Sequence, residues 1–443
     1  MELTTGSVPK LFRKFLYPSL FSGIVTSIYV LVDMIVVGQY EGELGAAAMA
    51  CNAPFWPLFC CISLLFGLPG SVLFSREKGA GDPEESNRWF TAACICMGAV
   101  LFCVWMVILL ADRWLLTVFG ADEEILPLAL RYMKWLKWGV PLYPAGLFLG
   151  MFVRSDGEPG LAGGSVIAGG ILNIIGDVFL TFTCDLGIEG AAIASVVGQA
   201  LADVILAVHF FKGSNTLRLV PVDRIRRRTG QLLQLGFAPF LGDVSMSFLT
   251  ILFNNQVMRL FGATELAIYG IGSNIFTTLQ TLSYGAGSAA QPIMAQNLGA
   301  GKPERVKQAA LCGIRTALIL GVAMTALMLI FPEQLSRLYM SATEEVYAAA
   351  VPILRRYFLC LTVMPVNVFA TYALQAVLQV RSTVMVSLLR GVVCSGILVY
   401  LMPALLGAGA LWYVMLAAEV ITCVFAVVYM RRYIFTADTY PSV

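Results

Sequence analysis

The phrase GAGDPE at residues 79–84 returns almost unchanged as GAGKPE at residues 299–304, half a chain later. The flanking residues correspond as well, since SREKGAGDPEESNR resembles AQNLGAGKPERVKQ. Farther upstream, Pro18 in the first half aligns with Pro239 in the second. Gly and Pro in such a phrase favour a tight turn that leads into the next helix. A polar phrase repeated at half the chain length indicates that one structural unit has been duplicated.

The composition is typical of a membrane protein. Hydrophobic residues make up 58% of the 443 residues and charged residues only 13%, against about 25% charge in soluble domains. Apolar runs such as Thr91–Ala111 are long enough to cross a bilayer, which takes roughly 20 residues. No small-residue cleavage site follows the first run, so we expect it to be a retained helix and not a signal peptide.

We expect an all-α polytopic membrane protein with twelve transmembrane helices in two parallel six-helix repeats. The expected spans run roughly over residues 15–38, 45–75, 88–111, 128–153, 161–183, 188–211, 233–261, 266–296, 308–331, 350–379, 383–404 and 409–430. An even number of spans in each half gives both halves the same orientation. The predicted domains are an N-terminal lobe (1–211), a basic linker (212–232) and a C-terminal lobe (233–443).

The linker KGSNTLRLVPVDRIRRRTGQ, residues 212–231, is the longest polar stretch and is rich in Lys and Arg. Basic segments between spans mark the cytoplasmic side of a membrane protein. Alternation of the spans then puts most of the 29 lysines and arginines, and both repeated phrases, on that side. We therefore expect a multi-pass protein of the cell (inner) membrane with both termini in the cytoplasm. Nothing aromatic or globular accompanies the linker, so no nucleic-acid partner is expected.

Several other activities find no support in the residues. A P-loop needs Gly-x4-Gly-Lys-[Ser/Thr], but Gln296 occupies the first glycine position and Pro303 follows Lys302. The stretch GAGSAA at 285–290 lies inside an expected span with no strand before it. Eleven cysteines without Cys-x-x-Cys spacing and the single His209 indicate buried structural residues and no metal centre. With no catalytic constellation and no ATP module, we expect a transporter driven by an ion gradient, without cofactor or ATPase subunit.

Acidic residues lie inside the expected spans, where each costs roughly 2.5–3.5 kcal/mol on insertion scales and is a functional candidate by default. They are Asp33, Asp177, Asp203, Asp243 and Glu419. Basic residues lie near span ends; Arg390 is the deepest, and we expect it to pair with Glu419. An acidic interior favours a cation as the transported substrate, as the coupling ion, or as both. Asp203, Asp243 and Glu419 are the secondary candidates.

The primary candidates lie one helical turn apart in pairs. Tyr29 precedes Asp33 by four residues, so its hydroxyl could hold or cover the carboxylate. Asn173 and Asp177 have the same spacing, and their oxygens suit Na⁺ or a proton shared through water. With the hydroxyl of Ser195, these residues predict one coupling-ion site for H⁺ or Na⁺. The alternative for Asp33 and Asp177 is a structural role in hydrogen bonding between helices. The alternative for Ser195 is that of a small residue that lets two helices approach closely.

The stretches YPSLFSGIVTSIYVLVDMIVVGQ, VRSDGEPGLAGGSVIAGGILNIIGDVFL and GIEGAAIASVVGQ, with the repeated phrase, resemble the multidrug and toxic compound extrusion (MATE) family over nearly the whole chain. The resemblance implies a twelve-helix antiporter that exports organic cations in exchange for H⁺ or Na⁺. It matches Asp33 to the family's first-helix aspartate, and Asn173 and Asp177 to its fifth-helix pair. Ser195 stands where some members have threonine, and Pro18 matches a proline at which the first helix bends.

The resemblance also has departures. Ser247 stands where some Na⁺-coupled members carry an acid, and Asn254 aligns with Asp33 in the second half. Ion chemistry is therefore expected mainly in the N-terminal half, as in the DinF-like branch. The expected partners are small organic cations and membrane lipids, with a monomer as the working unit. The alternative within the superfamily is a flippase for lipid-linked oligosaccharides or other lipids. Such substrates carry phosphates and would require a basic central cavity, whereas the interior expected here is acidic. A channel is a further alternative. Counterflow of the substrate against an ion gradient would exclude a channel and identify an antiporter.

Overall fold

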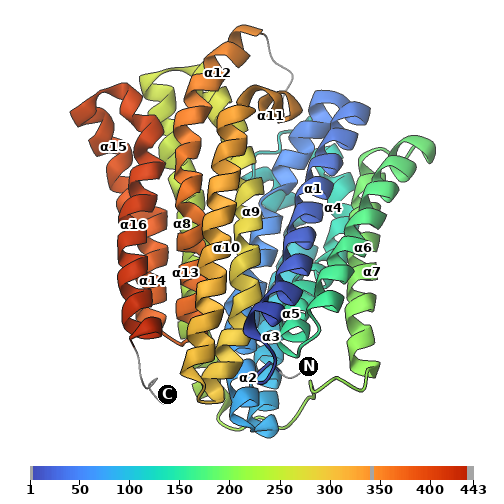
Figure 1. Ribbon diagram of the computed structural model, residues 1–443. Helices are drawn as coiled ribbons and strands as arrows, with labels where there is room; N and C mark the ends of the chain where they lie inside the picture. Colours follow the sequence, from blue (N-terminus) through green and yellow to red (C-terminus); the bar gives the residue numbers. More distant parts are fainter. Residues whose placement is uncertain (1–2, 340–343, 437–443) are drawn as a thin grey trace. The chain divides into compact units, whose positions relative to one another are not determined.

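The structure, a computed structural model, describes residues 3–339 and 344–436, apart from the side chains of residues 239, 243, 244, 247, 338, 339, 344 and 345. Figure 1 shows helices throughout, and the described residues form no β-strand. The expectations for Asp243, Pro239 and Ser247 concern side chains outside this description.

The first half of the chain contains seven α-helices and two short helical extensions. They are α1 (Val8–Asn52), α2 (Phe55–Ala80), α3 (Pro83–Val118), α4 (Leu126–Gly139), α5 (Leu142–Ser155), α6 (Pro159–Val178), the π-turn η1 (Phe179–Thr183), α7 (Ile188–Ala207) and the 3-10 turn η2 (Val208–Phe211). Gly42 (φ 68°) breaks α1 between the first two expected spans. The fourth expected span is built from α4 and α5, which are bent by 40° at their junction.

The second half has a similar content. Its elements are α8 (Ile225–Leu260), α9 (Ala263–Gly299), α10 (Pro303–Ile330), α11 (Pro332–Tyr339), α12 (Glu344–Tyr357), η3 (Phe358–Thr362), α13 (Met364–Ala376), α14 (Val380–Leu388), η4 (Leu389–Val393), α15 (Cys394–Leu406), η5 (Ala408–Tyr413), α16 (Val414–Met430) and η6 (Arg431–Phe435). Several spans are thus helices interrupted by a short π or 3-10 segment.

By length and apolar character, eight helical segments of the described chain could cross a membrane, or nine if α4 and α5 form one span. One of these segments, Val8–Ala80, contains the first two expected spans. The helices α8 and α9 are long enough but are not among the eight, and α9 carries many Ser, Thr and Asn residues. Such polar faces in a long helix are typical of residues that contact other helices or a water-filled cavity.

Both copies of the repeated phrase form a turn before a helix, as predicted. Gly81 (φ 84°) and Gly301 (φ 64°) have the left-handed backbone that glycine adopts without strain. Pro83 and Pro303 are the first residues of α3 and α10, where the missing proline N–H costs no helical hydrogen bond. The Asp82 side chain caps α3 by accepting a backbone N–H.

The chain divides into two compact units. The first is built on Tyr17–Gly236 and the second on Gly6–Leu16 together with the chain from Phe237 onward. In the second unit, the Arg305 side chain donates to the Gly6 carbonyl oxygen at 2.7 Å, which ties the start of the chain to α10. Residues 212–224, which precede α8, belong by their contacts to the first unit. The boundaries of two lobes and a separate linker stay a prediction.

Candidate functional site

The helix α6 has one line of glycines that faces α1. A Cβ added to Gly163 would lie 2.5 Å from the Pro18 Cβ, and one added to Gly170 would lie 2.6 Å from Val25 Cγ1. Only a residue without a side chain allows such close approach. Two helical turns span about seven residues, so Asp177, seven positions after Gly170, continues the same line. The sequence spacing therefore directs this carboxylate toward α1, which carries Asp33.

A second line of glycines on α6 faces α7, and Figure 1 shows these two helices side by side. A Cβ on Gly169 would lie 2.6 Å from the Gly198 carbonyl oxygen, and one on Gly176 would lie 2.9 Å from the Ala194 Cβ. The close packing of α6 on α7 brings Asn173, which lies between these two glycines, within hydrogen-bonding distance of α7.

The four primary candidates lie in one connected group. Asn173 Nδ2 donates to Asp177 Oδ1 at 3.3 Å and to Ser195 Oγ at 3.1 Å. The Tyr132 hydroxyl of α4 lies 3.4 Å from Asp33 Oδ2, a long hydrogen bond, and it also interacts with Ser195. The contacts run in order from Asp33 through Tyr132, Ser195 and Asn173 to Asp177, and the two carboxyl groups interact electrostatically.

Burial leaves the acids of this group without charge compensation. Asp33 is 7% exposed and Asp177 is fully buried. Asp33 Oδ1, Asn173 Oδ1 and Asp177 Oδ2 have no hydrogen-bond partner, and neither carboxylate forms a salt bridge within the described part of the chain. A buried charge without a partner is costly, so this cluster of oxygen atoms suits a bound cation or a proton.

A cavity of about 170 Å³ adjoins the group inside the first unit. Tyr29, Asn173 and Ser195 line it, together with Arg154 at the end of α5. This volume exceeds the roughly 30 Å³ that one water molecule occupies in the liquid. The polar group therefore borders space that could hold water or a hydrated ion.

The contacts of Tyr29 differ from the expectation. Its side chain lines the cavity, its hydroxyl is hydrogen-bonded to Tyr143, and it also interacts electrostatically with Asp33. The tyrosine that hydrogen-bonds to Asp33 is Tyr132. Tyr132 is not among the residues expected at this site from the sequence. The available signal was a tyrosine within the buried stripe of α4, which also includes Ala129 and Leu136; a buried hydroxyl needs a polar partner.

The acid of the second unit is compensated. Glu419 is 1% exposed, and Arg390 Nε donates to its Oε1 at 2.8 Å, which confirms the predicted pair. Asn367 Nδ2 donates to Glu419 Oε2 at 2.6 Å. These contacts give both carboxylate oxygens a donor, in contrast to the unpartnered oxygens of Asp33 and Asp177.

Asp203 and His209 form hydrogen bonds with residues outside the connected group. Asp203 on α7 accepts from Gln199 Nε2 at 2.8 Å and is half-buried. His209 is fully buried and its Nε2 lies 2.7 Å from Asp156 Oδ2, in agreement with the structural role expected for it. All eleven cysteines are free, and the described residues contain no cluster of three or more His, Cys, Asp or Glu side chains that could hold a metal ion.

Comparisons with known proteins identify the family. The family model described as MatE matches twice, over residues 18–179 and 240–401, in agreement with an internal duplication. The multidrug export protein MepA of Staphylococcus saprophyticus is 24% identical over 439 residues, which cover 98% of this chain and 96% of the relative. MepA of Staphylococcus aureus (strain MSSA476) is 25% identical over 97% of this chain and 95% of its own length.

Solved structures share the fold. One described as the outward-facing conformation of a multidrug resistance MATE family transporter of the MOP superfamily has a TM-score of 0.90 at 20% identity, over 98% of this chain and 97% of its own. A crystal structure of MATE in the bent conformation has a TM-score of 0.87 with the same identity and coverage. These neighbours have twelve helices in two lobes, which confirms the predicted fold class. The chain belongs to the MATE family, and it is a multi-pass membrane transporter and not an enzyme.

Proposed function

We propose that this transporter exports small organic cations in exchange for H⁺ or Na⁺, with access to its binding site alternating between the two sides of the membrane as the two six-helix lobes move. The observation that carries the proposal is the pair of buried, uncompensated carboxylates Asp33 and Asp177 in the first unit. The relatives are multidrug export proteins, which supports drugs as the substrate class.

The difference between the two units supports an ion site in the N-terminal half. Glu419 in the second unit is neutralised by Arg390, whereas Asp33 and Asp177 depend on neutral donors, Tyr132 and Asn173. Two carboxylates close together in a low dielectric cannot both stay charged at low cost. One of them takes up a proton, or the pair binds a cation.

The donor set suits either coupling ion. Carboxylate, amide and hydroxyl oxygens from Asp33, Asp177, Asn173 and Ser195 are the ligands that hard cations prefer, and the same carboxylates accept a proton. A cationic drug near these acids would compete with the ion, which couples the two movements without ATP. Competition need not be direct, because Asp33 lies on the helix that carries Pro18, and an ion-dependent bend of that helix would also couple them.

Inverted membrane vesicles test this proposal. Ethidium transport is driven in one experiment by a pH gradient and in another by a Na⁺ gradient, and the gradient that drives transport identifies the coupling ion. We expect Asp33→Asn and Asp177→Asn to insert normally but to reduce gradient-driven transport at least about tenfold, the effect of roughly 1.4 kcal/mol. Asn173→Ala should weaken coupling as well, and Ser195→Ala should do so less.

Asp203→Asn is the comparison variant, because Asp203 is a secondary candidate of the same unit that hydrogen-bonds to Gln199 instead of to the connected group. It should reduce transport less than Asp33→Asn and Asp177→Asn do. Wild-type rates in both Asp33→Asn and Asp177→Asn under either gradient would show that the site is assigned wrongly. Transport of lipid-linked oligosaccharide with no transport of ethidium would favour the flippase alternative.

A further inference from the structure

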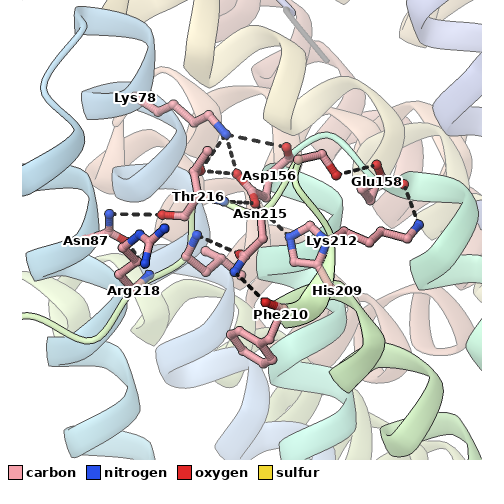
Figure 2. Close-up of polar contacts among 12 residues, drawn as sticks. Lys78, Asn87, Asp156, Glu158, His209, Phe210, Lys212, Asn215, Thr216 and Arg218 are labelled. Atoms are coloured by element: carbon pink, nitrogen blue, oxygen red, sulfur yellow. Dashed lines mark hydrogen bonds and ion pairs between the residues drawn. The ribbon is translucent and has the colours of Figure 1, made fainter.

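Residues 212–220 lie along the first unit and are anchored there by a buried carboxylate (Figure 2). Asp156, 2% exposed, accepts from the Thr216 backbone N at 2.8 Å and from His209 Nε2 at 2.7 Å. The Lys78 ammonium and the Thr216 hydroxyl also donate to Asp156. The chain that leaves η2 is therefore held in one place and is not a free tether.

Two side chains one turn apart on α3 hold the next residues. Asn87 Nδ2 donates to the Thr216 carbonyl oxygen at 3.0 Å, and Asn87 Oδ1 accepts from the Arg218 backbone N at 2.8 Å. Thr91 Oγ1 accepts from the Val220 backbone N at 3.0 Å. Alternate residues of the segment are thus hydrogen-bonded to α3, and side chains of the same segment form one wall of a groove.

The groove has a volume of about 740 Å³, within the roughly 300–1,000 Å³ range of ligand pockets. Its lining is mostly apolar and comes from α3, α5 and residues 210–219. The residues that matter here are Phe90, Met97, Phe148, Leu149, Leu219 and Arg218. The polar groups of the lining, Arg218 and Asn215, come from the anchored segment, so the groove is apolar along the helices and positively charged at this edge.

The Arg218 guanidinium is exposed, and no carboxylate of the described chain pairs with it. Arg228 of the same linker differs, because Glu85 and Asp223 hold its guanidinium in salt bridges. Large apolar side chains nearby also lie open, with Phe211 89% and Leu219 73% exposed. Exposed apolar side chains next to unpaired basic ones are typical of the membrane interface, where anionic lipids attract Lys and Arg.

We propose that this groove binds an anionic phospholipid of the cytoplasmic leaflet, with an acyl chain along Phe90, Met97 and Phe148 and the phosphate on Arg218. The lipid would bridge α3, α5 and the anchored segment, and it would stabilise the first unit without taking part in ion exchange or export. The leaflet follows from the proposed cytoplasmic orientation of the linker. The lipid class follows from the apolar lining and the unpaired guanidinium alone.

Native mass spectrometry of the purified full-length protein tests the site, with dioleoylphosphatidylglycerol and dioleoylphosphatidylcholine as probes. Arg218→Gln removes the headgroup contact, and Ala145→Phe fills the groove, which Ala145 also lines. Arg227→Gln is the matched control, because it removes the same charge from an exposed position of the same linker outside the groove lining. The measurement needs no ion gradient, so its outcome is separate from that of the proposed function.

We expect the wild type to retain one phosphatidylglycerol at least about fivefold more tightly than phosphatidylcholine, the effect of one Arg near the membrane surface. Arg218→Gln should lose this preference, Ala145→Phe should retain less of both lipids, and Arg227→Gln should match the wild type. Two outcomes overturn the inference: an unchanged preference in Arg218→Gln, or an equal loss in Arg227→Gln, which would make the effect one of linker charge in general.

Discussion

Gly163 of α6 lies directly against the backbone of Pro18 in α1: an added Cβ would come within 2.5 Å of the Pro18 Cβ and 2.7 Å of its carbonyl oxygen. The contact is with backbone, so it cannot be relieved by rotating a side chain. Even one methyl group on Gly163 requires α1 or α6 to shift. This contact holds the proline of α1 on the helix that carries Asn173 and Asp177.

We predict that Gly163→Ala slows gradient-driven ethidium transport several-fold while the protein still inserts. The methyl displaces α1 and so changes the position of Asp33 relative to α6. Gly164→Ala is the matched control, because a Cβ there meets nothing within 4 Å, and alanine favours a helix over glycine by about 1 kcal/mol. Equal rates for the two variants, each corrected for the amount of protein in the vesicles, would contradict the prediction.

Tyr132→Phe should impair ion coupling. The substitution removes the hydroxyl that contacts Asp33 Oδ2 at 3.4 Å and also interacts with Ser195, and it keeps the ring. Asp33 then loses its protein donor, so the pH or Na⁺ dependence of transport should shift in addition to the maximal rate falling several-fold. The measurement is the transport rate over a range of pH and Na⁺ concentrations.

Tyr269→Phe serves as the control for Tyr132→Phe. Tyr269 is also a buried tyrosine, but it packs against Phe253 in the core of the second unit, with ring centroids 5.3 Å apart. Loss of its hydroxyl should affect stability without shifting the ion dependence. An unshifted ion dependence in Tyr132→Phe would show that this hydroxyl has no part in coupling.

Local rules of sequence predict the helices and turns well. Apolar run length predicts the spans, and Gly-Pro chemistry predicts the turns at Gly81 and Gly301. Spacing by one helical turn also predicts the contact between Asn173 and Asp177, because both residues lie on the same helix. Charge pairing predicts Arg390 with Glu419, since a deep basic residue and a deep acid in neighbouring spans compensate each other.

Contacts between distant segments were not predictable in the same way. The donor to Asp33 is Tyr132, 99 residues away in sequence, whereas same-helix spacing favours Tyr29. The anchoring of residues 212–220 depends on Asp156, which follows α5, and on Asn87 of α3. Both residues lie far from the linker in the sequence. Periodicity within one helix carries no information on which neighbour a side chain meets, so these contacts required the packed structure.

Asp156 should make the stability of the first unit sensitive to acid. Burial by itself raises the pKa of this carboxyl group, but the hydrogen bonds from His209, Lys78 and Thr216 and the Lys78 charge outweigh burial and hold the pKa below its usual 3.8. A depressed pKa means that the folded state favours the ionised form. The stabilisation is complete above the unfolded pKa of 3.8 and is lost as the pH falls through the folded value.

We therefore predict that Asp156→Ala lowers the free energy of unfolding by about 3 kcal/mol at pH 7, because it leaves the buried His209 without its hydrogen-bond partner and the half-buried Lys78 without a counter-charge. Asp156→Asn should flatten the fall in thermal stability of the purified protein below about pH 4. Glu158→Gln is the control, since its partners Lys212 and Ser214 are exposed and such pairs contribute about 1 kcal/mol or less. An unchanged acid dependence in Asp156→Asn would exclude this carboxyl group as its source.

Single cysteines, in a background that lacks the native eleven, test the orientation of the chain. Ser214→Cys and Glu84→Cys occupy exposed positions in the linker and in the first repeated turn, and both should resist an impermeant thiol reagent in intact cells. Ser86 is unsuitable as a reporter, because it is only 1% exposed and donates to the Phe74 carbonyl oxygen. Glu123→Cys, exposed in the loop after α3, should be labelled; labelling of Ser214→Cys or Glu84→Cys from outside would reverse the orientation.

Arg390 and Glu419 should act as a structural pair and not as an ion site. Removing one partner of a buried ion pair leaves an uncompensated charge and typically costs about 3–5 kcal/mol, whereas replacing both with apolar residues of similar size is often neutral. We predict that Arg390→Met strongly lowers the amount of inserted protein, and that the double variant Arg390→Met, Glu419→Leu restores it. The double variant should also transport ethidium under the same gradient as the wild type, at a similar rate per molecule. If the double variant inserts normally but loses gradient-driven transport, Glu419 takes part in coupling, and the ion site extends into the second unit.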